Sequence, residues 1–414
     1  MSVLLLLVAF PAFGATLTLD EALADAHANP DRMAAEARAV ASQAAERATK
    51  ADALPSVSGS GSATVGGTVG STTAGTWKAG LQADQRLYDF GATPSAIRAA
   101  THTAEAAHAD VDEAVISVDL AVRQAFFAAA AAKALVAVAD EALANQDKHL
   151  AQVQAFVTVG TRAPIDLAKA KTDRANVLVA QIRARGDYQS AQAALAAAIG
   201  REVPLDADPD DTPFPAVDGE DTPVQLLFED AMKRRPDMLA SAQRGAAEFE
   251  TYLGARAALA PSLDAVGATD ASGSAGLTAG AASSPALAWD VGLQLAVPIY
   301  TGGAKRAEIA QDHASEMALD AETTALAVQI RLEIAQAQVA VVTDRAAVEA
   351  ADDAVDAART QLDLAQGRYD AGAGSAIELS DAQLGLRNAE AQRVGTVYDL
   401  ASARAKLIAA LGRP

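Results

Sequence analysis

The sequence predicts a mainly helical chain that carries two pairs of β-strands and consists of two similar halves. Three observations lead to this prediction. Long stretches without Pro or Gly are rich in alanine and other strong helix formers. Two shorter stretches show the period-two alternation that is typical of strands. Short motifs recur in the same order in both halves, which indicates an internal repeat.

The repeat is visible as matching residues at constant spacing. Pro30 and Pro236 lie 206 positions apart (236 − 30), whereas Trp77 and Trp289 lie 212 apart (289 − 77). The register therefore holds on both sides of one insertion of six residues, which we expect in a surface loop. We predict a first repeat over 16–200 and a second over 224–414. The connector at 201–223 is rich in Pro and acidic residues and is expected to be exposed and non-helical.

Composition and charge exclude several classes of protein. The chain has 53 acidic and 33 basic residues and a formal net charge of −20, which argues against nucleic acid as a partner and against docking on anionic lipid. The absence of cysteine excludes disulfides, thiolate catalysis and cysteine-ligated zinc. The five histidines show no ligand spacing and are expected at the surface. Phosphate-loop and nucleophile motifs are absent from the sequence, so we expect no enzyme activity, no cofactor and no metal.

The N-terminus predicts export. Residues 3–10 form an apolar run too short to cross a bilayer as a helix, and Ala12 and Gly14 provide small residues before a cut near Ala15. This predicts a signal peptide at 1–15, although no Lys or Arg precedes the run; a buried N-terminal segment is the alternative. After residue 15 no stretch offers 18 uncharged apolar residues, so we expect no membrane-spanning helix.

Each half contains one very long helix and two shorter ones. A helix is expected over 18–54 with a restart near Pro30, and uninterrupted helical sequence follows from Gly91 to about Val159. The second half has its long helix at about 304–371. At ~1.5 Å per residue these helices are on the order of 100 Å long. We expect turns at Gly160 and Gly372, followed by return helices at about 165–199 and 377–411.

The strand pairs are predicted at 56–88 and 262–300. Every odd position of 289–300 is apolar, and a similar alternation begins at Trp77. An apolar face opposite a polar one suits the wall of a barrel between lipid and a wet lumen. We expect Trp77 and Trp289 at one membrane interface and Tyr88 and Tyr300 at the other. An amphipathic strand in a soluble sheet is the alternative, and residues 56–75 taken alone would be typical of a low-complexity linker.

The number of strands bears on assembly. Single-chain membrane barrels begin at eight strands, and an open sheet edge in lipid leaves backbone groups unpaired. Four strands per chain therefore predict a shared barrel, and three copies would give twelve strands in the outer membrane. This reasoning favours a homotrimer with outer-membrane lipid around it.

These features resemble the TolC outer-membrane efflux family over nearly the whole chain. The resemblance rests on Asn29-Pro30, on Leu54-Pro55, on the turns Tyr88-Asp89-Phe90-Gly91 and Tyr300-Thr301-Gly302-Gly303, and on the segments around Gly160 and Gly372. It implies a trimer with a twelve-stranded outer-membrane β-barrel that continues into a long periplasmic α-helical barrel. It also implies a passive conduit for tripartite efflux or type I secretion, working with a periplasmic adaptor and an inner-membrane pump.

The resemblance also implies a periplasmic gate. Two acidic positions after the second tip turn fall on Glu378 and Asp381, whose spacing of three places them on one helical face. In a trimer six carboxylates would favour cations near the axis. A solvated acidic helix face is the alternative in so acidic a chain.

Further contacts of the family's closed entrance match only in part. Tyr369 matches the gate tyrosine and Asp166 its acidic partner, but Gly374 stands where the family has an arginine. Arg162 is a candidate to compensate. The adaptor-docking tips are expected at Gly160, Thr161, Arg162, Gly372, Ala373 and Gly374.

The competing hypothesis is a soluble periplasmic structural protein of coiled-coil type with a small β-sheet. The sequence does not name an exported substrate, because a passive tube selects weakly.

Overall fold

The computed structural model describes residues 15–67, 74–201, 207–276 and 286–413. The predicted signal peptide therefore lies outside the described residues except for Ala15. The chain divides into two compact units, which are described separately. The first comprises 1–35, 111–236 and 327–414, and the second comprises 36–110 and 237–326.

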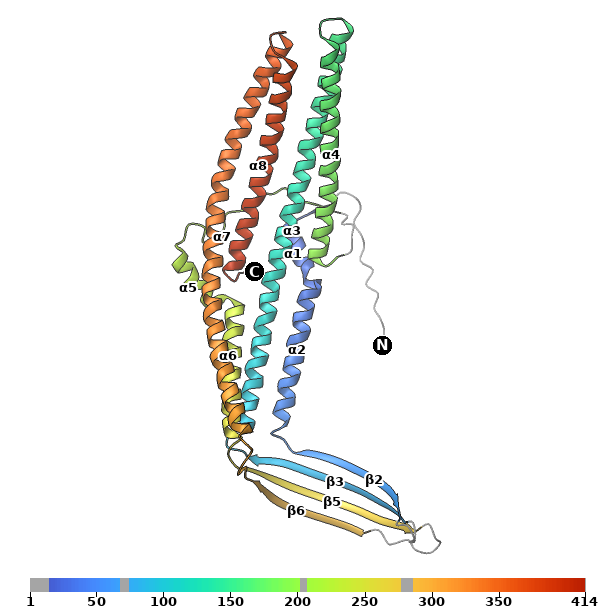
Figure 1. Ribbon diagram of the computed structural model, residues 1–414, viewed down its shortest axis with the longest axis vertical. Coiled ribbons are helices and arrows are strands. Elements are labelled where there is room, and N and C mark those ends of the chain that lie inside the picture. The colour runs from blue at the N-terminus through green and yellow to red at the C-terminus, as the bar shows by residue number, and fades with distance from the viewer. Residues whose placement is uncertain (1–14, 68–73, 202–206, 277–285, 414) are drawn as a thin grey trace. The chain divides into compact units, whose positions relative to one another are not determined.

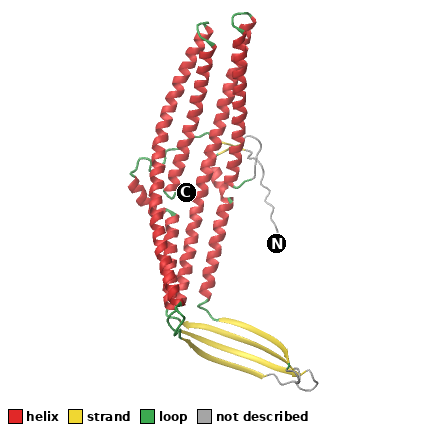
Figure 2. Cartoon of the chain, viewed as in Figure 1, coloured by secondary structure: helices red, strands yellow, loops and turns green. Residues whose placement is uncertain are grey.

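Helices dominate the chain, as predicted, and the strands form one four-stranded sheet and one short pair (Figures 1 and 2). The helices are α1 (Leu19–Asp25), the 3-10 helix η1 (Ala26–Ala28), α2 (Pro30–Ala51), α3 (Ala92–Thr158), α4 (Pro164–Ile199), α5 (Val224–Arg234), α6 (Pro236–Ala257), α7 (Ala304–Asp370) and α8 (Ala376–Ala410). The strands are β1 (Ala15–Leu17), β2 (Ser56–Gly66), β3 (Ala74–Tyr88), β4 (Ala207–Pro209), β5 (Ser262–Gly276) and β6 (Ala286–Ala296). Each half runs helix, strand pair, long helix, return helix.

The helix boundaries follow from local chemistry. Thr18 and Glu21 form a capping box at the start of α1. The helix predicted over 18–54 is interrupted at Asn29, whose side chain accepts from the backbone N–H of Asp31 and donates to the carbonyl of Ala198. Pro30 then occupies the first position of α2, where the missing N–H has no intrahelical partner to lose. Both long helices contain 67 residues.

The four-stranded sheet belongs to the second unit and has the antiparallel order β2-β3-β5-β6. The last strand ends at Ala296 rather than near Tyr300 as the alternation predicted. Pro298 has no backbone N–H to donate to a neighbouring strand, so the apolar alternation continues beyond the end of the ladder. Tyr300 therefore lies four residues past the strand (300 − 296).

The first unit contains two hydrophobic clusters. The larger packs α1, α3, α4 and α8 around residues such as Val122, Phe126 and Leu195. The smaller joins the α3/α4 and α7/α8 hairpins near their turns and is centred on Tyr369. α7 also contains one stretch that is long and apolar enough to cross a membrane by length and composition alone. Ile330 and Ile334 of that helix are fully buried in the first unit, whereas Val328 and Leu332 beside them are exposed.

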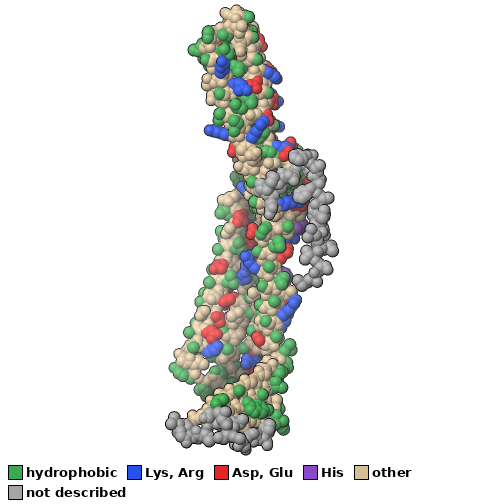
Figure 3. All heavy atoms as spheres, turned by 90° about the vertical axis from the view of Figure 1, so that its right-hand side faces the viewer, with side chains coloured by type: hydrophobic (Ala, Val, Ile, Leu, Met, Phe, Trp, Pro, Cys, Tyr) green, Lys and Arg blue, Asp and Glu red, His purple; other side chains and the backbone are tan. Residues whose placement is uncertain are grey.

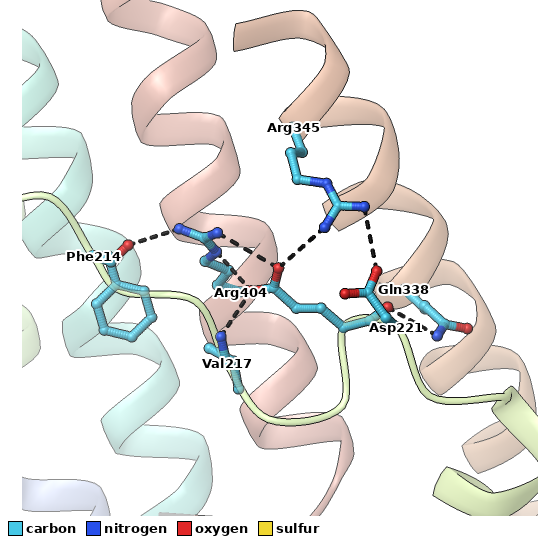
Figure 4. A network of polar contacts seen from close by, with 7 residues as sticks. Phe214, Val217, Asp221, Gln338, Arg345 and Arg404 are labelled. Carbon is cyan, nitrogen blue, oxygen red and sulfur yellow. Dashed lines mark hydrogen bonds and ion pairs between the residues drawn. The ribbon is translucent and has the colours of Figure 1, made fainter. Parts of the chain in front are cut away.

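The connector is not simply exposed, and that prediction was wrong in part. β4 pairs in parallel with β1, and Pro209 is fully buried. Farther along, the carboxylate of Glu220 accepts from the Arg404 guanidinium (2.8 Å) and from the backbone N–H of Val217 (2.8 Å), as Figure 4 shows. Arg404 also donates to the carbonyl of Phe214 (2.7 Å).

The same segment is bound to α7. Gln338 donates to the carbonyls of Glu220 and Thr222, and Arg345 forms an ion pair with Asp221 (3.3 Å). We call residues 214–222 the strap, because they bind α8 through the buried charge-assisted pair of Arg404 with Glu220 and bind α7 through Gln338 and the more exposed Arg345. Clustered acidic residues predict exposure, but here Arg404 and, at 4.0 Å, Arg345 compensate the buried carboxylate of Glu220.

Candidate functional site

Two glycine turns end the long helices, at the positions that the sequence predicted. Gly160 and Gly372 have φ values of +80° and +77°, which residues with a Cβ rarely adopt. After Gly160 the next helix, α4, begins at Pro164. After Gly372 the side chain of Ser375 caps α8 by accepting from the backbone N–H of Glu378 (3.1 Å).

Gly374 lies in the second turn and closes it. Its N–H donates to the carbonyl of Arg368 (2.8 Å). A Cβ at this position would lie 2.9 Å from the backbone nitrogen of Tyr369, a distance that real Cβ atoms essentially never show. The backbone of this turn thus leaves no room for the side chain of the arginine that the resemblance implies at this position.

Tyr369 is the centre of the tip. Its side chain is 1% exposed and packs against Val153, Ala170 and Leu379 from three other helices. The guanidinium of Arg162 lies 4.5 Å from the centroid of the tyrosine ring and donates to the tyrosine carbonyl (3.3 Å). Arg162 therefore takes part in the contact between the tips, although it stands in the other hairpin from Gly374.

The hydroxyl of Tyr369 has no hydrogen-bond partner within the described residues. The expected bond to Asp166 is thus not made inside one chain. Burial raises the pKa of Tyr369; Arg162 opposes this shift, and the negative charges of Asp166 and Asp370 add to it. Asp166 acts on the tyrosine through its field rather than through a direct bond.

Glu378 and Asp381 both lie on the exposed side of α8, whereas Leu379 and Ala382 between and beside them are buried. The predicted common face is therefore present. Glu378 forms an ion pair with Arg368 at the end of α7 (3.1 Å), a partner that the sequence pattern does not predict. Arg368 stands ten residues before Glu378 on the other side of the turn (378 − 368), where a helical spacing rule does not look for partners.

Polar bonds join the two hairpins behind the tips. Gln152 donates to the carboxylate of Asp370 (2.8 Å). Lys169 reaches both Asp173 (2.9 Å) and the hydroxyl of Ser380 (3.2 Å), and that hydroxyl donates to Asp173 (3.0 Å). These bonds and the cluster around Tyr369 hold the first hairpin against the second.

The second part of the candidate site is the four-stranded sheet. Directly opposed residues of antiparallel strands share a face, so the register defines two surfaces. Leu81 of β3 lies opposite Gly59 of β2 and Thr269 of β5, and Thr269 lies opposite Trp289 of β6. Small and apolar residues fill this face. We call it the apolar face; its residues include Val57, Ala63, Trp77, Ala79, Leu81, Ala271, Leu287, Trp289, Val291, Leu293 and Leu295.

The opposite face is polar. It carries Lys78, Gln82, Asp270, Asp290 and Gln294, together with the serines of β2. In the space-filling view, charged side chains are spread over the helices, whereas hydrophobic side chains gather towards the sheet end (Figure 3). The two-faced pattern expected from the sequence thus extends across all four strands.

The aromatic residues of the sheet lie on or next to the apolar face. Trp289 is 76% exposed, and the Trp77 indole lies against Gly273 on the neighbouring strand. A register shift between Arg86 and Tyr88 brings Tyr88 opposite Leu263, which belongs to the apolar face. Tyr300 is exposed beyond the end of β6. The structure thus leaves all four predicted interface aromatics accessible, with Trp77 the most covered of them.

One histidine departs from the sequence prediction. His149 of α3 is 8% exposed rather than a surface residue, and its ring lies edge to face with Tyr369 (centroids 5.5 Å apart). No group of three or more His, Cys, Asp or Glu that could hold a metal ion occurs in the described ranges. No local pattern predicts this burial, because Tyr369 lies on another helix, 220 positions along the chain (369 − 149).

Comparisons with known proteins identify the chain's relatives. The sequence profile of the outer membrane efflux protein family matches residues 19–201 and 227–413, one match for each half. Protein CyaE of Bordetella pertussis is 31% identical over 333 residues, which are 79% of this chain and 69% of CyaE.

Solved structures share the fold at lower identity. The CmeC outer membrane channel of Campylobacter jejuni aligns with a TM-score of 0.82 at 19% identity, covering 95% of this chain and 85% of CmeC. The open state of the MtrE outer membrane channel of Neisseria gonorrhoeae aligns with a TM-score of 0.78 at 20% identity, covering 95% of this chain and 89% of MtrE. With two profile matches that together span both halves, the chain belongs to the outer membrane efflux protein family, the TolC-type channels that its motifs resemble, and it is a transport protein rather than an enzyme.

Proposed function

We propose that the chain is the outer-membrane component of a tripartite efflux or type I secretion system, where it forms a passive conduit from periplasm to exterior. The observation that carries the proposal is the apolar face of the sheet. Val291 is 79% exposed there, and its neighbours along β6 are similarly open. A contiguous exposed apolar surface of this kind is typical of contact with lipid or with another protein.

The edges of the sheet favour a trimer. β2 and β6 each pair on one side only within the described chain, so each presents a row of free backbone groups. Hydrocarbon cannot satisfy those groups, whereas the edge of a second copy can. β2 of one chain pairing with β6 of the next, three times over, would close a twelve-stranded barrel with the apolar face towards lipid and the polar face towards the lumen.

The helix tips fit the role of a periplasmic gate. Tyr369 and Arg162 hold the two hairpins together, and Glu378 and Asp381 remain at the surface of α8. In a trimer these carboxylates would surround the entrance and attract cations. Opening then requires separation of the hairpins, which breaks the stacking of Arg162 on Tyr369.

The tips also suit docking of a periplasmic adaptor. Gly160 and Thr161 of the first turn and Gly372 and Ala373 of the second are exposed at the ends of the hairpins, and Arg162 is half-buried where it stacks on Tyr369. Gly374 differs, because it is buried inside its turn. We therefore propose the first five as the contact surface for an adaptor, with an inner-membrane pump behind it.

Cell fractionation tests the proposed function. The chain is produced with its own N-terminus in a Gram-negative host, and the outer membrane is separated from the soluble periplasm. We expect the protein in the outer-membrane fraction, released only by detergent, with a mass in detergent of three copies. Recovery in the soluble periplasm as a monomer would instead support the coiled-coil structural protein. A channel that conducts ions in planar bilayers separates a pore from an inert membrane anchor.

A further inference from the structure

His149 lies at the contact between the two hairpins. It extends from α3, and its ring meets the ring of Tyr369 on α7 at 5.5 Å between centroids and 62° between planes. The side chain is more than nine-tenths buried, and its Nδ1 has no hydrogen-bond partner within the described residues. A protonated imidazole carries two N–H donors, so the site as built suits the neutral ring.

The charged groups around His149 are largely engaged elsewhere. On α4, Asp173 is bound by Lys169 and by Ser380. On α7, Asp370 accepts from Gln152 and Gln366. Neither carboxylate forms a hydrogen bond with the Nδ1 of His149.

A cavity of about 580 Å³ is lined by residues from all four helices of the two hairpins, and His149 forms part of its wall. The remaining charged groups on its wall are Glu141 and Lys148 of α3, Asp363 of α7, and Arg387 and Glu390 of α8. The wall thus carries charges of both signs, and its volume is large enough for several waters. Water in this cavity supplies a route for a proton to the buried ring.

We propose that His149 is a proton-operated latch, whose neutral ring holds Tyr369 and keeps the two hairpins paired and whose protonation separates them. The inference rests on the proposed function in one respect: the entrance opens in acid only if the tips are the gate. The latch itself concerns the contact between α3 and α7.

The burial of His149 determines in which direction pairing of the hairpins changes with pH. Desolvation lowers the pKa of His149 below its usual value of 6.5; Asp173 and Asp370 oppose the shift, and Lys169 adds to it. A group with a lowered pKa stabilises the paired state above pH 6.5 and loses that contribution progressively as the pH falls below it. Pairing of the hairpins is therefore favoured at neutral pH and weakens in acid.

Spin labels measure the latch directly. The chain contains no cysteine, so Gln154→Cys on α3 and Leu364→Cys on α7 provide two unique exposed sites in different hairpins. The labelled chain is diluted with unlabelled chain, and the distance between labels is recorded by pulsed electron resonance from about pH 8 to about pH 5. We expect one distance at high pH and a second, longer one whose population grows below pH 6.5.

His149→Phe and His149→Gln serve as variants that do not titrate. Phe keeps the ring contact, and Gln keeps the polarity. Each variant is compared with the parent provided that its circular dichroism shows the same helical content. The other four of the five histidines remain in each. We expect distances independent of pH in both. A parent whose distance does not change with pH, or a change that persists in the variants, overturns the latch.

Conductance of the same proteins in planar bilayers separates the latch from the gate. If acid lengthens the distance between the labels and raises conductance in the parent alone, the latch and the gate are both supported. If it lengthens the distance without raising conductance, the latch stands and the tips are not the gate.

Discussion

Arg162 of the first repeat lies over the ring of Tyr369 of the second, with 4.5 Å between the guanidinium carbon and the ring centroid. The contact joins two hairpins whose turns, at Gly160 and Gly372, are 212 residues apart in sequence (372 − 160). A cation on an aromatic face contributes about 0.5–2 kcal/mol, more as water is excluded. We therefore propose that this stacking takes the place of a contact that the resemblance assigns to an arginine at position 374.

Replacing Arg162 should loosen the tip. For Arg162→Ala we expect the open population in planar bilayers to rise about twofold to thirtyfold, the factor that corresponds to the energy of a cation–π contact. Lys171→Ala removes one positive charge from an exposed position of the same hairpin and serves as the control. Equal effects of the two variants would mean that charge alone, rather than stacking on Tyr369, matters.

The acidic pair of α8 should set ion selectivity. In Glu378→Ala with Asp381→Ala we expect the cation-to-anion permeability ratio to fall about threefold or more, because six carboxylates leave the entrance and Arg368 loses its partner. Reversal potentials across a salt gradient measure this. Glu349→Ala with Asp353→Ala removes two exposed carboxylates from α7 and should leave the ratio close to that of the parent. An unchanged ratio in the α8 variant would remove these residues from the entrance.

Gly374→Ala should destabilise the second turn. The added methyl would meet the backbone of Tyr369 and Arg368 at 2.9–3.0 Å, so the turn or the start of α8 must shift. Gly385→Ala is the matched control, because nothing lies within 4 Å of a Cβ there. In the interior of α8 it should stabilise by about 0.5–1 kcal/mol. Thermal unfolding of both variants tests the opposite signs; a neutral Gly374→Ala would contradict the proposed backbone constraint.

The strap should depend on its buried carboxylate. Glu220 is 6% exposed, and its removal leaves the Arg404 guanidinium without its ion pair. Glu220→Ala should therefore lower the free energy of unfolding by about 3–5 kcal/mol. Asp221→Ala removes a 78% exposed carboxylate from the next position and should cost at most about 1 kcal/mol. Denaturant titrations of the two variants compare them, and similar losses would show that burial of Glu220 is unimportant.

Local patterns predicted the helices, the turns and the faces of the sheet. Gly160 and Gly372 could be recognised because a turn after a long helix needs a residue that tolerates positive φ. The two faces of the sheet followed from alternation. The end of β6 did not, since Pro298 limits hydrogen bonding without disturbing the hydrophobic pattern.

The sequence did not predict features that depend on partners distant along the chain. Glu220 was expected to be exposed within an acidic connector, yet its main partner is 184 positions away. His149 and the ion pair of Arg368 with Glu378 are similar cases. Each requires knowledge of which helices pack together, and period or composition within one segment does not contain that information.

The two faces of the sheet should respond differently to the same charge. Val291→Lys places an ammonium on the apolar face, where contact with lipid would cost about 2–4 kcal/mol near the middle of the bilayer. Asp290→Lys places it one residue earlier on the polar face, where a wet lumen solvates it. We expect the first variant to lose most of its yield in the outer membrane and the second to assemble with altered ion selectivity. The amount of detergent-extracted trimer and the bilayer conductance measure both effects. If the two variants assemble equally well, the apolar face does not contact lipid, and burial against a soluble partner becomes the better explanation of its composition.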